Sequence, residues 1–371
     1  MKGIEKTLIR QIHDKADSSF VNLGLGQPSF STPSSLLNQI RENIHKWNLG
    51  YSPNAGFPEL RELIAKHSGT NISPHQVCVT VGAEEALHAL LMVTVDPGDE
   101  VLIPDPGFPA YESLVRVAGG SPRKYPLLSE NDFSLNHLDV SNKVTPKTKV
   151  ILINSPNNPT GAVYSHGELE KLAEFIKKKD ILVVSDEVYN ELYYEEKPVS
   201  VADFLPGSAM INSLSKTFSM TGWRLGWCVG PSELIQLIIK FNQLAVICAP
   251  VISQKAGLFA LKGLADQEIK ANLKEMHQRR ETAMRCMKEF TDLDYVKPQG
   301  AFYVWVDVRR HMEKQGGSLD ISLKLLSKEK LVTIPGVAFG KGGEGYLRIS
   351  FAADPASIKE GIQRLGRFFK D

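Results

Sequence analysis

Cysteine is scarce in this chain, and the four that are present stand far apart, at Cys78, Cys228, Cys248 and Cys286. No two of them have the CxxC spacing that is typical of a zinc site or a redox motif. We therefore expect neither a metal centre nor a disulfide framework. Scattered cysteines of this kind favour the reducing environment of the cytoplasm.

The chain also lacks a strong net charge, because 43 Lys and Arg residues balance 42 Asp and Glu residues. Such a balance gives no field that would recruit nucleic acid or an anionic membrane, so any anionic ligand must be held by local groups. Long apolar runs are missing too, since the most apolar stretch, residues 234–252, is interrupted by Lys240 and Pro250. The first 20 residues have no apolar segment like that of a secretion signal. We expect no nucleic-acid partner, no membrane span and no export.

The most distinctive stretch is Ser-Leu-Ser-Lys-Thr-Phe-Ser-Met-Thr-Gly-Trp-Arg-Leu-Gly, residues 213–226. A lysine surrounded by hydroxyl residues and flanked by aromatic ones can be partly desolvated, which lowers its pKa and frees the amine for imine chemistry. Arg224 adds a permanent charge suited to phosphate. The stretch resembles the pyridoxal-phosphate lysine signature of the class I/II aminotransferases. That resemblance implies that Lys216 forms an imine with the cofactor, which Ser213 and Arg224 also bind; the alternative is a hydroxyl-rich loop with one exposed lysine.

A second segment has the pattern of an anion site. Residues 76–81 are an apolar strand, and Gly82 opens a helix that we expect to run to about Val95. Unpaired N–H groups at a helix N-terminus converge on whatever lies above them. The resemblance implies that Gly82, Ala83 and Glu84 hold the cofactor phosphate through their backbone amides. Glu84 departs from the usual short polar residue, and its carboxylate should repel a phosphate unless it turns away; an acidic first helical turn is the plainer interpretation.

Two more strands end in polar residues. Strand 149–154 is followed by Ser-Pro-Asn-Asn-Pro-Thr-Gly, and strand 180–185 by Asp-Glu-Val-Tyr. Open α/β sheets bind ligands at the carboxyl ends of their strands. By resemblance, Asn158 contacts the cofactor's phenolic oxygen and the substrate carboxylate. Asp186 pairs with the ring N–H, and Tyr189 donates to the ring oxygen.

The resemblance singles out four further residues, each of which could otherwise be a turn or packing residue. Gly26 lies against the substrate, and Arg348, on an apolar strand, binds the substrate carboxylate. Phe108 stacks on the cofactor ring, with Tyr111 as the less favoured candidate. Tyr51 reaches the cofactor phosphate of the neighbouring subunit, which implies a homodimer with shared active sites.

Strand, helix and turn signals recur about every thirty residues from 77 to 229, which predicts an α/β fold with a mainly parallel sheet and helices on both faces. We expect further helices at residues 4–16, 234–261 and 266–290.

The resemblance covers roughly residues 20–365 and implies fold type I of the pyridoxal-phosphate enzymes, in which a large domain is joined by a smaller α+β domain. Residues 41–275 form the predicted large, cofactor-binding domain. The small domain is discontinuous, with an N-terminal segment at 1–40 and a C-terminal part at 276–371.

These features predict a transaminase that moves an amino group from an L-amino acid to a 2-oxoacid. Lys216 would shuttle the proton, while Asp186 keeps the cofactor ring protonated. Two alternatives stay open. One is a β-lyase, because elimination begins from the same carbanion at the substrate α-carbon as transamination does. The other is a non-catalytic regulatory module that only binds the cofactor. No basic residue of this set is placed opposite a second substrate carboxylate, so the pattern does not assign the donor's side chain.

Overall fold

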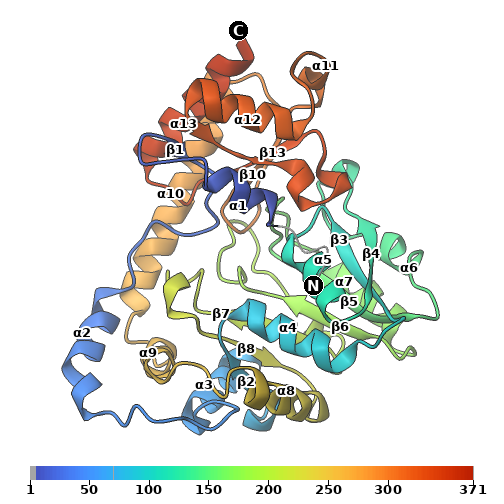
Figure 1. The fold of residues 1–371 in the computed structure, drawn as a ribbon, viewed down its shortest axis with the longest axis vertical. Coiled ribbons are helices and arrows are strands. Elements are labelled where there is room, and N and C mark those ends of the chain that lie inside the picture. The colour runs from blue at the N-terminus through green and yellow to red at the C-terminus, as the bar shows by residue number, and fades with distance from the viewer. Residues whose placement is uncertain (1–5, 70, 371) are drawn as a thin grey trace.

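A computed structural model of the chain describes residues 6–69 and 71–370. Its main sheet has seven strands in the order β2-β8-β7-β6-β5-β3-β4 (Figure 1). In chain order these strands are β2 (Val77–Thr80), β3 (Glu100–Asp105), β4 (Ser121–Pro126), β5 (Thr148–Asn154), β6 (Leu182–Asp186), β7 (Ala209–Ser213) and β8 (Gly226–Val229). Only β8 runs antiparallel to its two neighbours in this sheet. The prediction of an α/β fold with a mainly parallel sheet is confirmed.

Helices cover both faces of this sheet, which explains why inner strands such as β5 and β6 read as apolar runs. Successive residues of a strand point to opposite faces, and β5 shows the consequence. Val150 and Leu152 pack with one set of helices, and Ile151 and Ile153 pack with the other. The first set is α4 (Ala83–Thr94), α5 (Ala110–Val117) and α8 (Ser232–Ala245). The opposite face is covered by α2 (Ser34–Asn43), α3 (Pro58–Ser68), α6 (His137–Ser141), α7 (His166–Ile176) and α9 (Val251–Leu261).

A smaller antiparallel sheet, in the order β12-β13-β10-β9, is built from the last quarter of the chain. Its strands are β9 (Tyr295–Val296), β10 (Tyr303–Asp307), β12 (Ile334–Pro335) and β13 (Tyr346–Ser350). The remaining elements around it are α1 (Leu8–His13), β1 (Val21–Asn22), α11 (Met312–Gln315), α12 (Ser318–Glu329), β11 (Leu331–Val332) and α13 (Pro355–Lys370). Because β1 pairs with β11, the N-terminal segment lies among C-terminal elements, as Figure 1 shows.

The long helix α10 (Asp266–Phe290) joins the two sheets. Ile269, in its first turns, packs into the core beside the main sheet, whereas Met276 and Met287 belong to the core of the smaller sheet. The helix has the bounds predicted from the sequence. The predicted division at residues 40 and 275 stays a prediction; the first of these boundaries falls inside α2, which packs against α9.

One predicted helix is wrong. The structure has two helices, α8 and α9, where the sequence predicted a single helix over residues 234–261. The chain leaves α8 after Ala245 because Ile247 takes a left-handed conformation, with φ +67°, and Pro250 then starts α9. Of the helix predicted over residues 4–16, positions 4 and 5 lie outside the described residues, and α1 is shorter than predicted.

All four cysteines are free thiols. No group of acidic, histidine and cysteine side chains in residues 6–69 and 71–370 could hold a metal ion. Within the same ranges, every helix is too short or too polar to cross a bilayer. The cytoplasmic location stays a prediction.

Candidate active site

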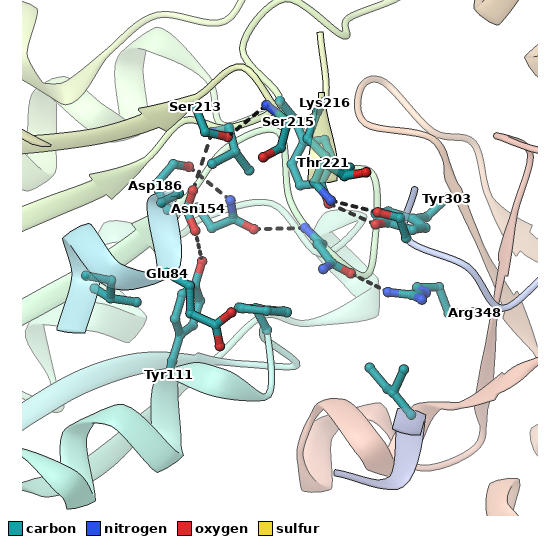
Figure 2. A pocket seen from close by; sticks show the side chains of 18 of the residues that line it. Glu84, Tyr111, Asn154, Asp186, Ser213, Ser215, Lys216, Thr221, Tyr303 and Arg348 are labelled. Carbon is teal, nitrogen blue, oxygen red and sulfur yellow. Dashed lines mark hydrogen bonds between the residues drawn. The ribbon is translucent and has the colours of Figure 1, made fainter. Parts of the chain in front are cut away.

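Polar residues at the carboxyl ends of three neighbouring strands converge on one cavity of about 260 Å³ (Figure 2). Asn154 ends β5, Asp186 ends β6, and Ser213 ends β7. This edge is where an open α/β sheet binds its ligand. The cavity lies between the main sheet and the smaller one, since β10 and β13 contribute Tyr303 and Arg348 to its wall.

Lys216 lies in the loop after β7, with its amine inside the cavity. Its Nζ donates a hydrogen bond to the Gly26 carbonyl at 2.6 Å. Burial, and then the positive charge of Arg348, lower the pKa of Lys216 to about 8. An amine with such a pKa is partly unprotonated near neutral pH, so it can act as a base or a nucleophile.

Asp186 lies at the base of the cavity and is held from two sides. The Tyr111 hydroxyl donates to its Oδ2 at 2.7 Å, and the Val188 amide donates to its Oδ1 at 3.3 Å. The Asn154 side chain fixes the backbone by donating to the Asp186 carbonyl at 2.9 Å. Burial raises the pKa of Asp186, whereas the bond from Tyr111 lowers it.

The loop between β2 and α4 forms an anion cradle. Gly82 caps α4 with φ +88°, a left-handed conformation that favours glycine. The Arg224 guanidinium lies directly against it: a Cβ at Gly82 would come within 2.6 Å of Arg224 Nη2. Arg224 is anchored by donating to the Thr221 and Val81 carbonyls at 3.1 and 3.3 Å. The free amides of the helix start and a fixed guanidinium together suit a phosphate.

Arg348 is a buried cation with no carboxylate partner among the described residues. It is 2% exposed, and its guanidinium lies 4.3 Å from the centre of the Tyr303 ring. Nη1 donates to Asn158 Oδ1 at 2.9 Å and Nη2 to the Gly24 carbonyl at 2.7 Å, while Nε finds no acceptor in residues 6–69 and 71–370. A buried charge of this kind requires an anion, and a substrate carboxylate can supply it.

The structure brings together most of the residues predicted from the sequence. Those that line the cavity are Gly26, Ala83, Glu84, Phe108, Asn158, Asp186, Tyr189, Ser213, Lys216, Arg224 and Arg348. Gly82 lies just behind the lining, against Arg224. Tyr51 is not part of the cavity within one chain, and it is 83% exposed.

Three residues of the site were missed or undervalued in the sequence. Tyr303 lines the cavity, and its hydroxyl lies 2.8 Å from that of Tyr189. Asn154 and Tyr111 both fix Asp186, although Tyr111 was considered only as a ring-stacking candidate. Tyr111 instead meets Phe108 edge to face, at 5.5 Å between ring centres. The aromatic pair in Gly-Ala-Phe-Tyr at the start of β10 is the signal that could have indicated Tyr303.

The donor groups of the cavity fit pyridoxal phosphate. Lys216 offers an amine of lowered pKa to the aldehyde, and Asp186 offers a buried carboxylate to the ring nitrogen. Gly82 and Arg224 form the cradle for the phosphate. The Arg224 guanidinium fits there because residue 82 is a glycine, since a Cβ at this position would collide with it. Tyr189 and Asn158 present polar atoms in the same cavity for the ring oxygen.

Comparison with known proteins gives a consistent answer. Residues 18–365 match the family model described as aminotransferase class I and II. The chain is 37% identical to a probable aspartate/prephenate aminotransferase of Aquifex aeolicus, over 95% of this chain and 91% of the relative. It is 35% identical to aromatic-amino-acid aminotransferase 2 of Thermococcus litoralis, over 100% of this chain and 97% of that relative. The solved structure of aspartate aminotransferase from Thermus thermophilus with maleate superposes with a TM-score of 0.93 at 31% identity, over 99% of this chain and 100% of that one.

Proposed function

Because the chain belongs to the class I and II aminotransferase family, and is therefore a pyridoxal-phosphate-dependent transaminase acting on amino acids and 2-oxoacids, we propose that Lys216 is its catalytic base. The observation that carries this proposal is the position of a buried amine with a pKa of about 8 in the same cavity as Asp186 and Arg348. Elimination and non-catalytic cofactor binding, the two alternatives open at the sequence level, do not match the aminotransferase names of the full-length relatives.

Pyridoxal phosphate, when bound, supplies an aromatic system that accepts the electrons of the bond broken at the donor's α-carbon. Lys216 Nζ would take the proton from that α-carbon and return it on the other side of the transfer. Asp186 would hold a proton on the ring nitrogen through its buried carboxylate. The Tyr189 hydroxyl would donate a hydrogen bond to the ring oxygen.

Arg348 and Asn158 would orient the substrate. The unpartnered Nε of Arg348 and its two Nη groups point to a carboxylate ligand, and Asn158 is already tied to Nη1 at 2.9 Å. A planar guanidinium holds a carboxylate in a fixed orientation, which places the α-hydrogen toward the base. A Cβ added at Gly26 would lie only 2.9 Å from the Tyr303 hydroxyl, so a larger residue there would crowd the wall of the cavity that Tyr303 lines.

We also propose that two chains form a dimer with shared sites. Large apolar side chains are exposed at and near the loop that carries Tyr51: Leu49 is 48% exposed, Ile247 41% and Leu244 88%. Asn54 Nδ2 donates to the Ile247 carbonyl at 2.7 Å, so the two segments belong to one surface. Such a surface favours association, and Tyr51 within it can reach the phosphate cradle of a second copy.

The role of Lys216 is tested by Lys216→Ala in a transfer assay in which both the oxoacid product and the new amino acid are followed. We expect kcat to fall by about a thousandfold or more, because a positioned base contributes at least this much together with imine formation. Borohydride treatment of the cofactor-loaded wild type should attach the cofactor to the peptide that contains residue 216, and the variant should show no such attachment.

Lys178→Ala, at an exposed residue after α7, is the matched control and should behave as the wild type. A Lys216→Ala protein that transaminates at the wild-type rate would remove the catalytic assignment.

A further inference from the structure

Every charged side chain that lines the cavity has a proposed role in binding or catalysis, except that of Glu84. Three basic side chains, Lys216, Arg224 and Arg348, and two acidic ones, Glu84 and Asp186, line it. The proposed function assigns the amine, the phosphate and the α-carboxylate to the three cations, and the ring nitrogen to Asp186. Glu84 has no such task, and its carboxylate makes no hydrogen bond or ion pair with any residue in 6–69 or 71–370.

Glu84 is not needed to start its helix. Acidic residues in a first helical turn usually compensate the free amides and the helix dipole. In α4 the next residue does this, because the Glu85 carboxylate turns back and accepts a hydrogen bond from the Val81 amide at 3.0 Å. The Glu84 side chain instead lies among the side chains that surround the cavity (Figure 2).

The part of the lining that remains for a substrate side chain carries no charge apart from Glu84. Its apolar residues are Ile9 and Leu87, and its polar ones are Ser215, Thr221 and Tyr303. Leu87 follows Glu84 by three residues on α4, so the two lie on one face of the helix. A donor's side chain would therefore meet uncharged groups and one carboxylate, and no described basic residue of the cavity is left to bind a second substrate carboxylate.

We propose that Glu84 determines donor specificity: it selects amino acids whose side chain ends in an amide or a cationic nitrogen, and it rejects dicarboxylic donors such as aspartate. This inference rests on the proposed function, in which Arg348 and Arg224 are occupied by the α-carboxylate and the phosphate. Glu84 is exposed to solvent at the cavity, so a like charge there is repelled only modestly, whereas opposite charges or amide donors are favoured.

The test uses pairs of donors that differ in charge and hardly in shape, namely aspartate with asparagine and glutamate with glutamine, together with ornithine. Values of kcat/KM are measured for the cofactor-loaded wild type and for Glu84→Gln, which keeps the backbone amide. We expect the wild type to prefer the amide of each pair. Glu84→Gln should shift the aspartate/asparagine ratio toward aspartate by about tenfold, the effect of one like-charge contact in a partly solvated site, and should lower the ornithine value.

Glu170→Gln is the matched control, because Glu170 on α7 is 59% exposed and lies outside the cavity. It should leave every ratio unchanged. Binding of maleate and of a monocarboxylate to both loaded proteins, followed by calorimetry, gives a readout without turnover, and only maleate binding should tighten in Glu84→Gln.

Two results would overturn the inference: a wild-type preference for aspartate over asparagine, or donor ratios in Glu84→Gln within twofold of wild type. The second result together with tighter cofactor binding would mean that Glu84 acts on the phosphate alone. These outcomes differ from failure of the proposed function, in which the wild type would transfer no amino group from any donor.

Discussion

Asp186 shows how one contact sets the charge of a buried carboxylate. Burial raises its pKa, and the hydrogen bond from Tyr111, at 2.7 Å, opposes that rise. Loss of this bond would raise the pKa of Asp186 further, so the carboxylate would be charged only at higher pH. Tyr111 is therefore a positioning residue that favours the ionised form of Asp186.

Tyr111→Phe should shift the acid limb of the pH dependence of kcat to higher pH. It should reduce kcat by at most about tenfold, the usual effect of one hydrogen bond to a charged group. Asp186→Asn, which removes the charge itself, should reduce kcat by about a hundredfold or more at all pH values, as expected when a preorganised charge is lost. Cofactor content is checked by visible absorbance in both proteins. An unshifted acid limb in Tyr111→Phe would contradict this role of Tyr111.

Residues that stand within a local motif were identified from the sequence alone. Lys216 and Arg224 belong to one such motif, and the structure places both in the cavity. Tyr303 could not be identified in this way, because its importance comes from contact with Tyr189, which is 114 residues away in the chain. Such a partnership depends on how β10 is placed against the main sheet, and no local pattern records it.

At the scale of elements, the long periodic helix α10 was predicted with its bounds, whereas the irregular connection between α8 and α9 was not. The bounds of α10 follow from its apolar spacing. The break between α8 and α9 was missed, although Pro250 stands in it, because the residues on both sides are apolar enough for a helix. The joint between β2 and α4 was predicted, since a strand, a glycine and an acidic helical start leave few other conformations.

That joint supports a prediction about cofactor affinity. Gly82→Ala should weaken pyridoxal-phosphate binding by about tenfold or more, because φ is +88° and the added Cβ would displace the Arg224 guanidinium. Affinity is measured by adding cofactor back to the cofactor-free protein. Gly207→Ala, where an added Cβ meets nothing within 4 Å, is the control. Equal affinities for the two variants would mean that the cradle does not bind the phosphate.

At the scale of the molecule, the site depends on segments from both ends of the chain. Arg348 Nη2 donates to the carbonyl of Gly24, 324 residues earlier. Pairing of β1 with β11 holds this arrangement. One predicted site residue, Tyr51, lies on the surface instead, 83% exposed and beside other exposed apolar side chains. The proposed second copy of the chain would account both for the exposure of Tyr51 and for that of its apolar neighbours.

We propose that a working site combines Lys216 of one chain with Tyr51 of the partner subunit, and hybrid dimers test this proposal most directly. A Lys216→Ala chain and a Tyr51→Ala chain, each inactive alone, are co-expressed with different tags, and the dimers that carry both tags are isolated. One site of such a hybrid has both lesions and the other has neither. We expect each hybrid to recover about half of the wild-type activity, as two-fold symmetry requires. Isolated hybrids with no more activity than the two parental proteins would contradict the shared site.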